Sequence, residues 1–179
     1  MPSIDEQFQQ RRNQVTPAAG GIPGAPFSLI LWRDLFVMID DGRGRPNDYE
    51  RAADAVIARS KGYPGGIACI TIIPPNAKPP PDDSRRAINT ALERMERLKS
   101  LCWLVEGRGF EAAMVRGVLT GIRMFGRHRY PTTVGSNLQQ SVAWSLPHLA
   151  GGTARLTDVP LAASVIMQER LVGGIVETD

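Results

Sequence analysis

The stretch "IACITII", residues 67–73, decides the fold. It carries no charged side chain, and most of its residues are β-branched, which favours a strand. Apolar residues follow one another without the alternation of a half-exposed strand, so we expect both faces to be covered. This pattern is typical of a central strand in an α/β sheet.

Helical patterns flank this strand. Before it, Asn47 and Glu50 have the spacing of a capping box, and Gly62 follows as a stop signal. After it, a proline-rich loop leads into a charged segment that carries an apolar residue at each turn, namely Ile88, Leu92, Met95 and Leu98. The charges alternate in sign, which indicates a solvated outer face. We therefore expect a first helix before the strand and a second, amphipathic helix after it.

A second strand and a third helix come next. The stretch "LCWLVE", residues 101–106, is again apolar along nearly its whole length. The segment 109–126 then predicts a helix that ends at Gly126. Its apolar positions fall on one side at helical spacing, namely Phe110, Met114, Val118, Ile122 and Phe125.

The remaining elements lie at the two ends of this pattern. Residues 130–135 predict a short fifth strand, and Ser136 with Gln139 resembles a capping box that opens a fourth helix. Near the start of the chain, residues 27–32 and 35–40 are two short apolar runs separated by two residues, which is the spacing of a β-hairpin.

The predicted order is therefore ββαβαβαβα. It indicates an α/β fold with a mixed, mainly parallel five-stranded sheet and four core helices. Residues 1–26 contain a Pro/Gly/Ala segment and predict a flexible N-terminal arm, and residues 27–149 form the domain. Residues 150–179 form an extension with one short apolar helix. We expect that helix to dock on its own domain or on a second copy, so a homodimer is one interpretation.

Composition excludes several function classes. The chain has 179 residues with a net charge of +3, an excess too small to indicate nucleic acid. It shows no secretory signal pattern at its N-terminus and no apolar run of the ~18 residues that a membrane span needs, so we expect a cytoplasmic protein. Cys69 and Cys102 lie in apolar strands and are interpreted as buried thiols. Nothing in the sequence requires a metal or another cofactor.

The element order, combined with "VEGRGFEAAMVRGVLTGIRMF" and "YPTTVGSNLQQSVAWSLPHL", resembles the SpoIIAA-like branch of the STAS superfamily. The resemblance covers residues 28–149 and includes Arg108, Pro131 and Trp144. It implies a STAS-type mixed sheet and a regulatory role in binding another protein, such as a kinase-like anti-sigma factor. It implies no catalytic activity.

The same resemblance singles out the start of the second helix. Phosphorylated members of the family carry a Ser or Thr in an Asp-Ser-x-Gly type motif there, and this chain has Asp83 and Ser84 followed by Arg85 and Arg86, without the glycine. Ser84 is therefore a candidate phosphoacceptor, in a region that we also expect to contact a partner. The simpler interpretation is a helix cap, in which Asp82, Asp83 or Ser84 accepts backbone N–H groups.

Basic residues gather along the third helix. Arg116, Arg123 and Arg127 share one stripe, and Arg108 flanks it. Most charged stripes are solvated faces, but an acidic partner protein, an anionic lipid headgroup or nucleic acid could bind this one, with nucleic acid the weakest case because aromatic residues are not interleaved.

Gly117 and Gly121 lie on the same helix, and each costs about 1 kcal/mol relative to alanine in a helix interior. Close approach of the helix backbone to the sheet or to a neighbouring helix is the simplest account of them. An interface with a second subunit is the other.

Catalytic motifs for acyl transfer, phosphate binding or zinc-dependent hydrolysis are absent from the sequence. Two functional classes remain. The first is a non-enzymatic regulatory or scaffolding module that binds another protein. The alternative is a carrier of a small apolar ligand or lipid, which requires a pocket of about 300–1,000 Å³ between sheet and helices. Met38, Met114 and Met124 are candidates to line such a pocket.

Overall fold

A computed structural model describes residues 15–17, 27–75, 77–125 and 129–149. Within this part of the chain, six strands form one sheet in the order β1-β2-β3-β4-β5-β6. The elements are β1 Val15–Pro17, β2 Phe27–Trp32, β3 Leu35–Asp40, α2 Pro46–Ser60, β4 Ile67–Ile73, α3 Asp82–Arg94, β5 Leu98–Val105, α4 Phe110–Phe125, β6 Thr132–Gly135, α5 Leu138–Ser145 and the 3-10 turn η1 Leu146–His148.

Strand directions confirm the predicted α/β class. Strands β1, β2 and β3 pair antiparallel, whereas β3, β4, β5 and β6 pair parallel. The sheet is therefore mixed and mainly parallel, and α2 to α5 are the four expected helices. Strands β2, β3 and β4 begin and end at the predicted residues, and β2 and β3 form the predicted hairpin around Arg33, whose φ is 54°.

One strand was not predicted. Val15–Pro17 pairs antiparallel with β2 at the edge of the sheet. The prediction of an arm without secondary structure is wrong for these three residues, because a strand this short has no periodic pattern to detect. The other residues of the N-terminal arm lie outside the described part of the chain, as do the C-terminal extension and its predicted helix.

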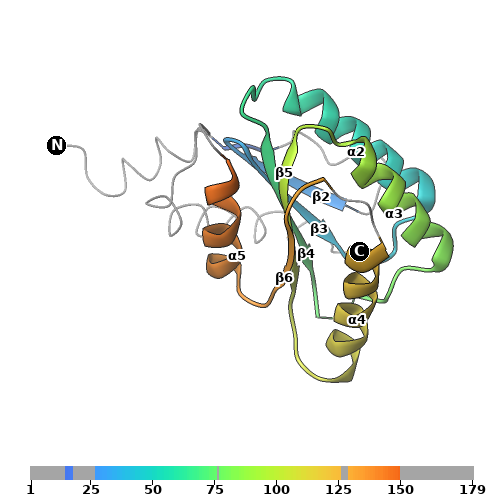
Figure 1. Ribbon diagram of the computed structural model, residues 1–179. Coiled ribbons are helices and arrows are strands. Elements are labelled where there is room, and N and C mark those ends of the chain that lie inside the picture. The colour runs from blue at the N-terminus through green and yellow to red at the C-terminus, as the bar shows by residue number, and fades with distance from the viewer. Residues whose placement is uncertain (1–14, 18–26, 76, 126–128, 150–179) are drawn as a thin grey trace, which may run out of the picture.

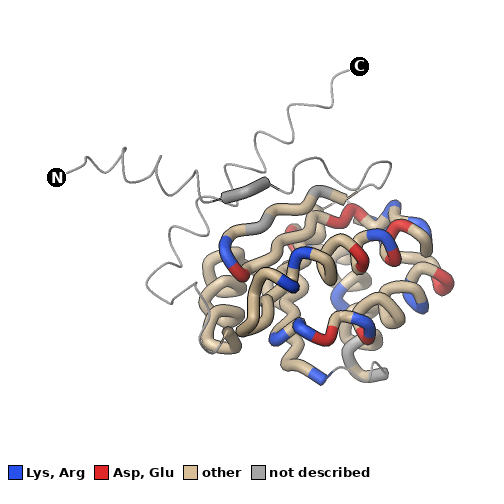
Figure 2. The backbone as a smooth tube through the Cα atoms, turned by 90° about the horizontal axis from the view of Figure 1, so that it is seen from above, with Lys and Arg blue, Asp and Glu red and all other residues tan. Residues whose placement is uncertain are grey.

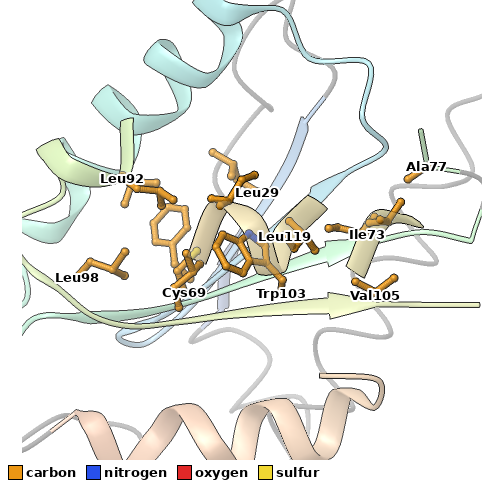
Figure 3. Packing of buried hydrophobic residues seen from close by; sticks show 14 of the residues in the cluster. Leu29, Cys69, Ile73, Ala77, Leu92, Leu98, Trp103, Val105 and Leu119 are labelled. Carbon is orange, nitrogen blue, oxygen red and sulfur yellow. The ribbon is translucent and has the colours of Figure 1, made fainter. Parts of the chain in front are cut away.

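Helices cover both faces of the sheet (Figure 1). Helix α5 packs on one face, where its Val142 joins a cluster with Ile70 of β4. Helices α2, α3 and α4 cover the other face, where Cys69 and Trp103 of the sheet join Leu119 of α4 in a second cluster (Figure 3). The full burial of β4 confirms that it is a central strand.

Helix caps and ends differ from the prediction by a few residues. The side chain of Asp48, not Asn47, caps α2, because its carboxylate accepts the backbone N–H of Arg45 at 2.9 Å. Asn137 rather than Ser136 caps α5, accepting the backbone N–H of Gln140 at 3.1 Å. Helix α3 ends at Arg94, and Leu98, predicted as its last apolar position, is the first residue of β5. In each case a neighbouring residue has a side chain of the same kind, so the sequence pattern fits more than one position.

Candidate functional site

In the described part of the chain, the solvent side of α4 is unusual because it exposes large apolar side chains. Phe110 is 77% exposed, Met124 is 74% exposed and Met114 is 41% exposed, and these are the exposed large hydrophobic residues in the part of the chain that the structure describes. An aromatic side chain carries about 150–250 Å², so the three together expose roughly 300–400 Å² of apolar surface, a patch size that is often functional.

These residues form one line along the helix together with Gly117 and Gly121. The five positions are separated by four, three, four and three residues, a spacing that keeps them on one side of a helix. We call this line the outer face of α4. The opposite side holds the buried residues Ala112, Val115, Leu119 and Ile122. Helix α4 is thus apolar on its solvent side as well as on its core side, which is typical of a helix that has neighbours on both.

The predicted core stripe of this helix is therefore wrong in part. Ile122 is buried and Val118 is partly buried against the core, but Phe110 and Met114 point to solvent. Two apolar stripes run along the helix, and helical spacing alone fits both equally well. The sequence could not show which of them meets the sheet.

The glycines of the outer face are open to solvent. Among the described residues, a Cβ atom built on Gly117 or Gly121 has no neighbour within 4 Å. The predicted close approach of the sheet is therefore wrong, and none of the described helices approaches these positions. An approach by a second chain stays a prediction, and the open space leaves room for it.

A groove of about 560 Å³ runs beside this face, between α4 and the start of α3. Its lining residues are Asp82, Arg85, Arg86 and Asn89 of α3, and Gly117, Val118, Gly121 and Ile122 of α4. The structure thus brings together the two regions that the sequence singled out for partner binding. One wall is polar and carries two arginines, and the other is apolar and contains both glycines.

At the start of α3, the charged residues are arranged as follows. Arg85 forms an ion pair with Asp82 within the helix, whereas Arg86 is exposed. Exposed pairs of this kind contribute about 0–1 kcal/mol, so both arginines can exchange their contacts for those of an acidic partner. Asp83 is exposed, and its Oδ1 accepts the backbone N–H of Ser84 at 2.7 Å.

Ser84 itself is only 1% exposed. Its hydroxyl donates a hydrogen bond to the carbonyl oxygen of Gly44 at 3.0 Å, which ties α3 to the loop before α2. That loop is tightly packed, since a Cβ atom on Gly44 would lie 2.5 Å from the ring of Phe27. This geometry favours a structural role for the serine. Its phosphorylation stays a prediction and would require the helix start to open.

Arg116 is the one residue of the predicted basic stripe of α4 whose side chain the structure describes. Arg116 is half-buried and donates to the carbonyl oxygens of Val105 and Gly107, each at 3.3 Å. It therefore fixes the end of β5 to α4. Over the described part of the chain, Lys and Arg are interspersed with Asp and Glu rather than gathered on one side (Figure 2).

The structure describes the other predicted arginines less completely. Arg108 is exposed in the loop before α4. Arg123 lies on α4, but its side chain is outside the description, and Arg127 lies outside the described residues. The structure therefore does not test whether these positions bind a partner.

A small cavity lies between the sheet and helices α2, α3 and α4, with a free volume of about 70 Å³. Met38 lines it, together with Met95, but Met114 and Met124 do not. The volume is well below the ~300–1,000 Å³ of a pocket for a drug-sized ligand, so a lipid has no room in this arrangement.

Both cysteines are buried, as predicted. Burial raises the pKa of the Cys69 thiol to about 12 and also raises that of Cys102, so both are protonated and unreactive near neutral pH. In the described ranges, no cluster of His, Cys, Asp and Glu could hold a metal ion, and no helix could cross a membrane.

Comparison of the chain with protein families, curated proteins and solved structures finds no match.

Proposed function

We propose that this protein is a non-enzymatic regulatory or scaffolding module of the STAS type, which binds another protein through the outer face of α4 and the adjoining groove. The apolar outer face carries the proposal. Phe110 and Met124 expose most of their surface at the two ends of a helix that is otherwise anchored in the core. Large exposed apolar side chains around small central residues are typical of a surface that a second helix covers.

The two glycines favour a helix as the bound element. Each glycine costs about 0.5–1 kcal/mol in a helix interior relative to alanine, and neither is needed for contacts within the described structure. A partner helix that crosses at Gly117 and Gly121 could bring its backbone close to α4, with Phe110 and Met124 packing on either side of the crossing.

The α3 wall of the groove specifies the polar side of the partner. Arg86 is exposed, and the ion-pair partner of Arg85 within the described residues is Asp82, an exposed neighbour on the same helix. Carboxylates of a partner could pair with both guanidinium groups in bidentate geometry. The expected partner segment is therefore an amphipathic helix with an apolar face and acidic residues along one flank.

Affinity capture with quantitative mass spectrometry tests this proposal. The full chain serves as bait in a lysate of the cells that naturally express it, beside the variant Phe110→Asp. Phe110 is the first residue of α4, where an acidic side chain is compatible with the helix dipole, so the variant should fold normally. We expect a specific partner whose recovery falls at least tenfold, as for a large apolar side chain that the partner buries.

Thr90→Asp is the matched control, because Thr90 is exposed on α3 and outside the groove lining. It introduces the same charge and should leave recovery unchanged. Equal recovery by wild type, Phe110→Asp and Thr90→Asp would contradict the proposed surface.

A further inference from the structure

Asp40 is the acidic residue among those that line the cavity between the sheet and the helices. It ends β3 and is 8% exposed, and it lines the cavity beside apolar groups from Phe36, Val56 and Trp103. In α/β folds, ligands bind preferentially near the carboxyl ends of parallel strands, which is where this carboxylate lies. The question for a buried carboxylate at such a position is which group compensates its negative charge.

The hydrogen bonds that the structure shows use only part of the accepting capacity of the Asp40 carboxylate. The backbone N–H of Gly42 donates to Oδ1 at 2.8 Å, and the hydroxyl of Tyr49 donates to Oδ2 at 3.2 Å. An ionised carboxylate can accept about four hydrogen bonds. The donors that the structure shows therefore leave room for about two more.

The charged surroundings of Asp40 do not neutralise it. The pKa of Asp40 is raised to about 6, mainly because burial desolvates the carboxylate; the hydrogen bonds from Gly42 and Tyr49 oppose this rise, and the neighbouring Asp41 adds to it. The other titratable groups around it are Asp48, Tyr49, Lys78 and Cys69; of these, Lys78 is cationic, but its side chain is exposed at the cavity mouth. Buried charges in proteins are normally paired.

We propose that the cavity binds a small primary alkylammonium ion, whose NH₃⁺ group donates to the free positions of Asp40 and whose alkyl chain lies among the apolar side chains. An ammonium group supplies three donors and the missing positive charge in one step. Met38 and Met95 line the cavity, and their flexible side chains can adjust to the chain of the ligand. This inference is independent of the proposed partner surface on α4.

The volume sets the size of the ligand. A single water needs ~10–15 Å³ measured in this way, so 70 Å³ holds about five atoms of that size. Butylammonium, with four carbon atoms and one nitrogen, is the matching probe. 1-Butanol has the same number of heavy atoms without the charge, and it serves as the control ligand.

The experiment is an NMR titration of the full chain with butylammonium chloride and, separately, with 1-butanol. The amide of Gly42 is the reporter, because it donates to Asp40. At pH 7 we expect a saturable shift of this signal, with butylammonium binding at least tenfold more tightly than 1-butanol. Because a primary ammonium stays protonated below pH 8, a fall from pH 7 to pH 5 should weaken its binding about tenfold through protonation of Asp40 alone.

The variant Asp40→Asn separates the carboxylate from the cavity. It should bind butylammonium and 1-butanol with similar affinity and without the pH dependence. Butylammonium binding that is no tighter than that of 1-butanol, or that is unchanged by Asp40→Asn, would overturn the proposal. The absence of any shift with either probe would overturn it as well, and the pH titration of the wild-type protein keeps the test decisive if the variant does not fold.

Discussion

Asp40→Asn should stabilise the protein near neutral pH, because it removes a buried negative charge while keeping a side chain of the same shape. Burial raises the pKa of this carboxyl from its ordinary value of 3.8 to about 6. A difference of about 2 pKa units corresponds to roughly 3 kcal/mol of stability linked to protonation. This is an upper value, since the asparagine amide must still accept from Gly42 and accommodate Tyr49.

The pH dependence follows from the sign of the shift. Between about pH 4 and pH 6 the native protein holds a proton on Asp40 that the unfolded chain has released. The free energy of unfolding therefore falls as the pH rises through this window, and above about pH 6 the native state carries the full cost of burying the charged carboxylate. The variant lacks this group and should show no such fall.

Urea unfolding monitored by circular dichroism at pH 4.5 and pH 7.5 measures both effects. The difference in free energy of unfolding between Asp40→Asn and wild type should be positive at pH 7.5 and smaller at pH 4.5. Other carboxylates, such as Asp48, titrate in both proteins and cancel in this difference. A variant that is equally destabilised at both pH values would refute the claim that the charge of Asp40 is uncompensated.

Two further predictions concern α4 and the start of α3. Gly117→Ala combined with Gly121→Ala should raise the free energy of unfolding by about 1–2 kcal/mol, because both positions are open, and should weaken partner capture. Urea denaturation and affinity capture of the same samples measure the two effects, and unchanged capture would contradict a binding role for this face. Ser84→Ala should lower the free energy of unfolding by about 1–2 kcal/mol, because the hydroxyl that donates to Gly44 is lost, and an unchanged urea midpoint would argue against this tie.

Several elements could be predicted from the sequence because one feature fixed each of them. The apolar run of β4 allowed no other interpretation, and the two-residue gap at Arg33 determined both the hairpin and the ends of its strands. Helix caps were harder, since polar residues follow one another at the start of α2 and α5, and only the observed contacts show that Asp48 and Asn137 serve as caps.

The sequence and the structure direct attention to the same two elements for different reasons. The start of α3 and the helix α4 were both singled out, but for their charges, whereas the structure directs attention to Phe110 and Met124. Two apolar stripes on one helix cannot be ranked from spacing alone, because the choice depends on how the helix is rotated against the sheet. Asp40 was not singled out, since nothing in the neighbouring sequence reveals that Tyr49 and the cavity cover it.

Site-specific photo-crosslinking in living cells tests the proposed binding surface most directly. A photoreactive phenylalanine analogue replaces Met114 on the outer face of α4, and in a separate protein it replaces Glu50, which is exposed on α2. Our account predicts a discrete adduct with another protein from position 114, lost when Phe110→Asp is added, and no such adduct from position 50. No discrete adduct from position 114, or the same adduct from both positions, would contradict it.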